Sequence, residues 1–121
     1  MKRTTLLSSA GAVILGALSM NVSADEQRFV AADNSVGTQL CMAITKDSPL
    51  KLKKAMDYHR ARTHLVVNDL QCNDLTVRQF ASLYGFERSM KRLNITPLTE
   101  TSIRDLAKVH GDKLNVVVGS K

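Results

Sequence analysis

The longest apolar run of the chain lies at its N-terminus, between Leu6 and Leu18, and is broken only by Ser and Gly. Two basic residues precede it, and small residues follow it up to Ala24. A positive start, an apolar stretch too short to span a bilayer permanently and a small-residue cleavage site are the three parts of a secretory signal peptide. We therefore expect residues 1–24 to be a signal peptide and residues 25–121 to form a single exported domain.

Two stretches that follow place apolar side chains at the spacing of an α-helix. Asn34 or Ser35 can cap the first helix, which we expect to run to about Lys46. The second opens at Ser48-Pro49, where a hydroxyl cap precedes a proline at the first helical position. The expected buried faces are Val36, Leu40, Ala43 and Ile44 in the first helix, and Leu52, Ala55, Met56 and His59 in the second.

The second half of the chain predicts two further helices. We expect a third helix over Leu75–Tyr84 that Gly85 terminates, because glycine readily ends a helix in the left-handed conformation. A fourth helix is expected to open at Ser102, three residues before an aspartate, and to end at Gly111.

The segments around these helices are less regular. Leu65–Val67 can be a strand or a helix end, residues 68–74 are expected to form a loop, and residues 86–93 can add a helical turn or two. Residues 114–118 have strand propensity. The sequence thus predicts a mainly α, small single-domain helical fold of about four short helices, with a short strand near the C-terminus.

Two cysteines, Cys41 and Cys72, follow the expected signal peptide. An isolated pair in an oxidising compartment usually forms a disulfide, so we expect the two to be joined. A bond between Cys41 and Cys72 closes a loop of about 31 residues. In the chain-entropy model this removes denatured-state entropy worth about 3–4 kcal/mol. Reactive dithiols favour Cys-x-x-Cys spacing and structural zinc needs four ligands, and the chain has neither pattern.

The exported part is expected to be basic. Without the two basic residues of the signal peptide it has 15 Lys and Arg against 11 Asp and Glu, a formal charge of +4. The segment from Lys46 to Arg62 has six basic residues against two acidic ones, an excess equal to that of the whole exported part. Its candidate contacts with an anionic partner are Lys51, Lys53, Lys54, Arg60 and Arg62. The alternative is a solvated face that only keeps the protein soluble.

No arrangement in the sequence indicates catalysis. Acidic residues are scattered singly, whereas glycosidase chemistry needs two carboxylates across a pocket and a nucleophile needs a base. We expect a protein that is not an enzyme, with no catalytic residues and no cofactor.

A periplasmic metal site is one alternative function. His59 and His64 are five residues apart and so do not share the helical face of a two-histidine motif. Met42, Met56 and Met90 are types of residue that bind copper, but at helical spacing among Leu and Ala they are typical of a core.

DNA binding is a second alternative. Phe80-Ala81, Gly85 and the basic residues around Lys91 are similar to a helix-turn-helix over about 20 residues. The expected export opposes this interpretation, since chromosomal DNA lies in another compartment.

Four segments resemble a family of small secreted bacterial proteins that carry a domain of unknown function. They are Phe29–Ser35, Leu40–Ala43, Leu70–Asn73, and Phe80-Ala81 with Tyr84-Gly85. The resemblance implies export and a helical domain with paired cysteines, and it brings no catalytic residues. The family pattern has Asn-Gly where this chain has Asn73-Asp74, a difference that concerns the turn after Cys72.

Together these features predict a periplasmic or secreted protein that works by binding. The expected partner is an envelope protein or an anionic envelope polymer, with no nucleic acid and no stable membrane insertion after signal cleavage.

Overall fold

The computed structural model describes residues 27–110 and 115–121, which form six helices and four short strands around one core. The expected signal peptide and the expected stop at Gly111 lie outside the described residues. The mainly helical class and the short strand near the C-terminus are confirmed. The elements are β1 (Arg28–Ala31), α1 (Val36–Thr45), α2 (Pro49–Tyr58), α3 (Thr63–Asn68), β2 (Gln71–Cys72), β3 (Leu75–Thr76), α4 (Val77–Tyr84), α5 (Glu87–Arg92), α6 (Glu100–His110) and β4 (Asn115–Val118).

Three helix ends lie where the sequence predicts them. The Ser35 hydroxyl accepts a hydrogen bond from the Thr38 amide at the start of α1, and the Ser48 hydroxyl does the same for Lys51 at the start of α2. Gly85 ends α4 with a φ of 76°, a left-handed conformation that favours glycine.

The third predicted helix begins two residues late, because residues 71–76 form a hairpin. Leu75 belongs to β3, which pairs antiparallel with β2, and Thr76 caps α4 through a capping box with Gln79. Asn73 and Asp74 both have left-handed φ angles, 55° and 65°, as a two-residue hairpin turn requires. Asp tolerates this conformation, so the turn forms without the glycine of the family pattern.

The described residues form six helices, more than the four expected, because two ambiguous segments are helical. Leu65–Val67 lies within α3, and residues 87–92 form α5, separated from α4 by Gly85 and Phe86. The buried Ser89 hydroxyl donates to the Ile44 carbonyl at 2.9 Å, which ties α5 to α1.

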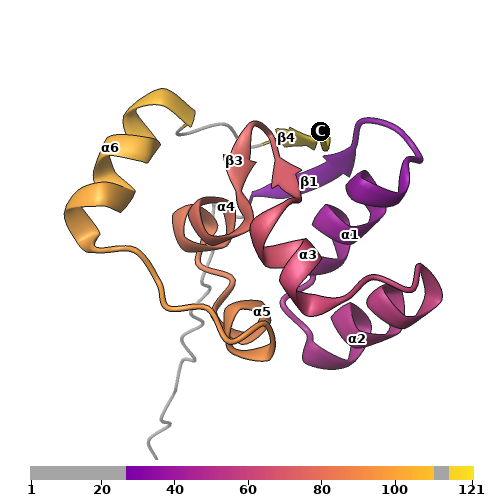
Figure 1. The fold of residues 1–121 in the computed structure, drawn as a ribbon. Coiled ribbons are helices and arrows are strands. Elements are labelled where there is room, and N and C mark those ends of the chain that lie inside the picture. The colour runs from indigo at the N-terminus through magenta and orange to yellow at the C-terminus, as the bar shows by residue number, and fades with distance from the viewer. Residues whose placement is uncertain (1–26, 111–114) are drawn as a thin grey trace, which may run out of the picture.

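The expected start of the fourth helix at Ser102 is wrong. Helix α6 begins at Glu100, and the Thr99 hydroxyl accepts from the Ser102 amide at 3.3 Å, so Thr99 provides the capping oxygen. Figure 1 shows α6 beside α4, at the end of a long connection from α5. No residue of α6 is fully buried, so this helix lies at the edge of the core.

A parallel pairing joins the two ends of the described chain. Strand β1 pairs with β4, with Phe29 opposite Val116 and Val30 opposite Val117. Beyond β4, Ser120 forms an antiparallel bridge with Cys72, which connects this pair to the β2–β3 hairpin. In Figure 1, β1 and β4 lie side by side behind the helices.

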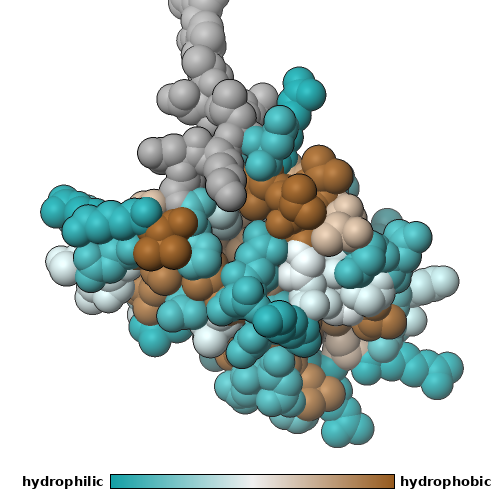
Figure 2. Space-filling model, turned by 90° about the horizontal axis from the view of Figure 1, so that it is seen from above, coloured by the Kyte–Doolittle hydropathy of each residue, from teal (hydrophilic) through white to brown (hydrophobic). Residues whose placement is uncertain are grey.

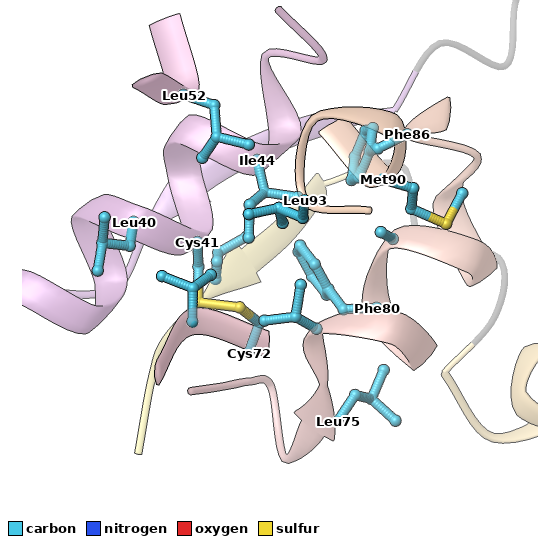
Figure 3. Packing of buried hydrophobic residues seen from close by; sticks show 14 of the residues in the cluster. Leu40, Cys41, Ile44, Leu52, Cys72, Leu75, Phe80, Phe86, Met90 and Leu93 are labelled. Atoms are coloured by element: carbon cyan, nitrogen blue, oxygen red, sulfur yellow. A yellow bond between two sulfur atoms is a disulfide. The ribbon is translucent and has the colours of Figure 1, made fainter. Parts of the chain in front are cut away.

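The core lies between α1, α4, α5 and the strands. Phe80 is fully buried and points into the middle of the cluster in Figure 3. Its ring packs edge-on against Tyr84, with centroids 5.3 Å apart, and Phe29 packs edge-on against both Tyr84 and Phe86. Strand β1 thus contributes an aromatic side chain to the same core as the helices.

The outer face of the β1–β4 pair carries uncovered apolar side chains. Val30 and Val117 are register partners and are 53% and 61% exposed. From above, Figure 2 shows a mostly hydrophilic surface interrupted by separate hydrophobic areas.

Candidate functional site

The three lysines of α2 lie on its solvent side, but they do not share one environment. Lys51 and Lys54 are three residues apart and therefore neighbours along one side of the helix. Lys53 is also exposed but lies on a different part of the helix surface, where its Nζ is 2.6 Å from Asp57 Oδ2. That exposed ion pair stabilises the helix by only a few tenths of a kcal/mol, about 0.3–0.5.

The other four predicted basic residues have free charges. Among residues 27–110 and 115–121, none of their side chains forms an ion pair or a hydrogen bond. All four are exposed: Lys51, Lys54, Arg60 and Arg62. Their charge is therefore available to a partner.

Arg60 and Arg62 lie beyond the end of α2, in the turn to α3. The Arg60 amide donates to the Asp57 carbonyl at 3.2 Å, and the Ala61 amide donates to the Met56 carbonyl at 2.8 Å. This is a Schellman motif with Arg60 at its left-handed position, φ 55°, where glycine is the usual residue. Arg62 precedes α3 without capping it through its side chain.

Replacing Arg60 by glycine should stabilise the protein. An L-residue in the left-handed conformation costs about 1–2 kcal/mol, and the added freedom of glycine in the unfolded chain offsets about half of that. We expect Arg60→Gly to raise the free energy of unfolding by about 0.5–1 kcal/mol in urea titrations. The matched control is Arg62→Gly, where φ is −89° and no strain is relieved. A loss of stability in Arg60→Gly would contradict the left-handed assignment.

The predicted disulfide between Cys41 and Cys72 is present and links α1 to β2. Both cysteines are completely buried, so neither sulfur is open to a solvent reductant or a metal ion. The bond is therefore structural.

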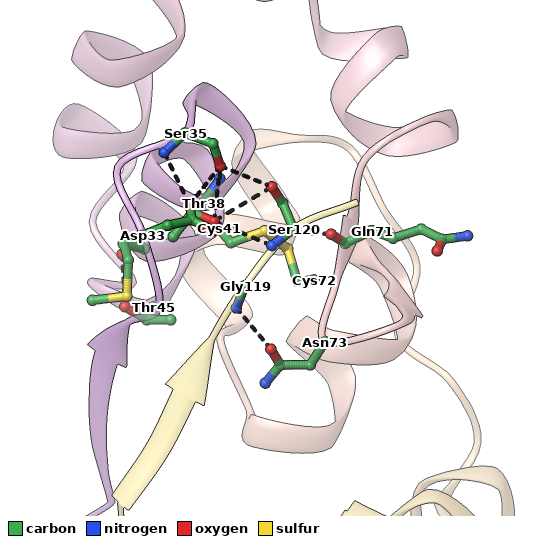
Figure 4. Close-up of a disulfide and its surroundings, with 11 residues drawn as sticks. Asp33, Ser35, Thr38, Cys41, Thr45, Gln71, Cys72, Asn73, Gly119 and Ser120 are labelled. Carbon is green, nitrogen blue, oxygen red and sulfur yellow. Dashed lines mark hydrogen bonds between the residues drawn. A yellow bond between two sulfur atoms is a disulfide. The ribbon is translucent and has the colours of Figure 1, made fainter.

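A hydrogen-bond network surrounds this disulfide and holds the segment 119–121 (Figure 4). The Ser120 amide donates to the buried Thr38 hydroxyl at 3.1 Å, and the Ser120 hydroxyl lies 3.3 Å from that of Ser35. The Gly119 amide donates to Asn73 Oδ1 at 2.9 Å. The segment is thus fixed both to the start of α1 and to the hairpin turn.

Two ionisable groups near this network have shifted pKa values. Hydrogen bonds from the Ser35 hydroxyl and amide, at 2.7 and 2.9 Å, lower the pKa of Asp33. The stability they contribute is present above the unfolded-state pKa and is lost as the pH falls through the lower folded-state pKa. The hydrogen bond with Asp74 raises the pKa of Lys121. Elsewhere, burial among aromatic rings raises the pKa of Tyr84.

The histidines are neither core residues nor a metal cluster. His59 is half-buried, with Nε2 3.0 Å from Gln39 Oε1, and His64 is exposed. His110 is also half-buried and lines a groove of about 290 Å³ between α4 and α6. No group of three His, Cys, Asp or Glu in the described residues could hold a metal ion. Met56 and Met90 are buried in the core, which leaves their sulfurs no open coordination position.

The segment that resembles a helix-turn-helix has a short second helix. Helix α5 has six residues, and Met90 and the adjoining Leu93 are buried. Arg88 and Lys91 remain exposed beside them. A six-residue helix offers less than two turns to a DNA groove, fewer than the recognition helices of that motif.

None of the helices in the described part of the chain has the length and apolar character that crossing a bilayer requires.

A comparison with known proteins identifies the family of this chain. The model of a protein family of unknown function, DUF3718, matches residues 40–108, which is more than half of the 121 residues. The match includes both cysteines, all six helices except the ends of α1 and α6, and the basic segment. No curated protein and no solved structure matches the chain. With its paired cysteines and helical core, the chain belongs to the DUF3718 family of proteins of unknown function.

Proposed function

We propose that this protein is an exported, non-enzymatic binding module of the cell envelope that contacts an anionic partner through Lys51, Lys54, Arg60 and Arg62. The partner is an acidic envelope protein or an anionic envelope polymer. One observation carries the proposal: these four exposed cations have no intramolecular partner among the described residues, whereas Lys53 of the same helix is paired with Asp57.

The proposed contact depends on charge. Unpaired cations along one helix and the turn that follows it create a positive field that accelerates encounter with an anion. Because all four are exposed, their interactions are screened by salt, and the Debye length falls from about 10 Å at 0.1 M to about 3 Å at 1 M.

The disulfide supports the compartment assigned in this proposal. Disulfides persist in oxidising surroundings and are rare where thiols are kept reduced. A buried structural disulfide in a domain of this size suits a protein that works outside the cytoplasm.

Removing two unpaired lysines should weaken binding to a polyanion. We expect Lys51→Gln with Lys54→Gln to elute from immobilised heparin at clearly lower salt than the wild type, because two uncompensated charges are lost. The fold should be unaffected, since both side chains are exposed. The melting temperature measured on the same samples checks this.

The matched control removes the same charge elsewhere. Arg88→Gln with Lys91→Gln also lowers the net charge by two, on the exposed side of α5. We expect it to elute close to the wild type. If the two double variants elute together, only net charge matters and the proposed surface is wrong. If the α5 variant is the weaker one, the contact belongs to the segment that resembles a helix-turn-helix.

A further inference from the structure

A groove of about 390 Å³ lies where the turn between α2 and α3 meets α1, the elements grouped on the right of Figure 1. Its volume is at the small end of the range for ligand sites, about 300–1,000 Å³. The groove is shallow and open to solvent, and most of its lining residues are apolar: Leu40, Ala61, Leu65, Val66 and Leu70.

Part of this apolar lining is open to solvent. Leu65 is 44% exposed although it lies in a helix that packs on the core, whereas Leu40 and Val66 are almost completely buried. An apolar ligand that binds here would cover the exposed surface of Leu65. Burial of apolar surface is the main source of favourable free energy in small-molecule sites.

The rim carries charged side chains of both signs. Arg60 and Lys121 line the groove together with His59 and one acidic residue, Asp69. Lys121 is already 2.8 Å from Asp74, and His59 is bonded to Gln39. Arg60 is therefore the cation of the rim that lacks a partner among the described residues.

The fold does not need an arginine at this position. Arg60 occupies the left-handed position of the Schellman motif, where glycine is the least strained residue. Residues whose strained backbone lowers the stability of the protein are frequent at ligand sites. An arginine held there places a planar fork of donors, which suits a carboxylate, at the mouth of an apolar groove.

We propose that this groove binds a small anionic amphiphile, an acyl chain of medium length with a carboxylate head, with its chain on Leu65, Val66 and Leu70 and its carboxylate on Arg60. The occupant is the free fatty acid, because phospholipids carry their acyl chains as esters without a free carboxylate. The groove supplies its own apolar lining, so this inference does not depend on the polyanion contact of Lys51 and Lys54.

The probe is decanoate, titrated below its critical micelle concentration into the full exported chain and followed by backbone amide NMR shifts. We expect saturable shifts centred on residues 60–70. Decyltrimethylammonium has the same chain with the opposite charge and should bind at least about tenfold more weakly. Equal binding of the two probes, or shifts spread over the whole surface, would overturn the proposal.

Variants separate the charge from the fold. Arg60→Gly should weaken decanoate binding by about tenfold or more, since a charge-assisted hydrogen bond is lost, while the protein becomes more stable. Arg60→Lys keeps a positive charge and should retain most of the affinity. Leu65→Gln should also weaken binding. An unchanged affinity in both Arg60→Gly and Leu65→Gln would show that the ligand does not use this groove.

Two further experiments complete the test. Vesicle sedimentation separates a free fatty acid from a lipid surface, and a lysine variant separates this proposal from the polyanion contact. Phosphatidylglycerol vesicles present a phosphodiester and no free carboxylate. Binding of decanoate without sedimentation with these vesicles is the expected result. Sedimentation of the wild type with the vesicles and no binding of decanoate would overturn the proposal. Lys51→Gln with Lys54→Gln should bind decanoate like the wild type, so heparin elution and decanoate affinity can fail separately.

Discussion

Replacing both cysteines by alanine should lower the free energy of unfolding by about 3–4 kcal/mol. The disulfide joins residues 31 positions apart, and without it the unfolded chain regains the entropy of that loop. Both sulfurs are completely buried, so the double variant Cys41→Ala, Cys72→Ala also leaves unfilled space in the core. For a small domain with a total stability of about 5–15 kcal/mol, this loss is large.

Urea unfolding of the oxidised wild type and the double variant measures this effect. The wild type unfolded and refolded under reducing conditions is the matched control, because it loses the cross-link and keeps the side-chain volume. We expect it to lose slightly less stability than the alanine variant. A difference below about 1 kcal/mol between oxidised and reduced wild type would mean that the disulfide contributes little to stability.

The second large effect is expected from Gly37→Ala, with a loss of about 2 kcal/mol. Gly37 lies in the first turn of α1, where alanine would ordinarily favour the helix. Here a Cβ atom on residue 37 would lie 2.7 Å from the Cβ of Ser120 and 3.3 Å from Leu70 Cδ1. Segment 119–121 would have to move away, which breaks the hydrogen bond from the Ser120 amide to the Thr38 hydroxyl.

Gly119→Ala is the control for this prediction. A Cβ at residue 119 would meet only the Cβ of Ala32, at an ordinary 3.4 Å, so we expect a change within about 0.5 kcal/mol. Thermal unfolding of both variants tests the pair. A gain of stability in Gly37→Ala would show that helix propensity outweighs the contact and that segment 119–121 is loosely held.

These two predictions concern one structural unit. The disulfide ties α1 to β2, and Ser120 bridges Cys72 while bonding to Thr38 of α1. Loss of either contact weakens the attachment of the end of the described chain to its first helix. Strand β4 directly precedes this segment, so its parallel pairing with β1 should weaken as well.

Local chemistry in the sequence was sufficient for most of the helical elements and for the disulfide. Ser35 and Ser48 cap the starts of helices with their side chains, and Gly85 ends a helix through its left-handed φ angle. Each of these effects involves only residues a few positions away. The pairing of Cys41 with Cys72 could be predicted because a chain with two cysteines has one intramolecular pairing, and the expected export favours oxidation. The exposure of the lysines followed from helical periodicity.

Long-range contacts required the structure. The short apolar run at Phe29 became β1 only through β4, whose paired residues are 87 positions later in the sequence, and no local pattern encodes such a partner. The late start of α4 has a similar cause, because Leu75 is drawn into a hairpin by its pairing with Cys72.

For the candidate site, the sequence alone determined which residues carry the charge, and the tertiary structure decided which charges are free. Lys53 and Lys54 are adjacent in sequence, yet Asp57 pairs with Lys53 and leaves Lys54 without a partner. The groove beside Arg60 brings together Leu40, Leu65 and Lys121 from three distant segments. Apolar surfaces meet wherever packing places them, so composition and spacing predict a basic segment, whereas only the packed chain forms a groove next to it.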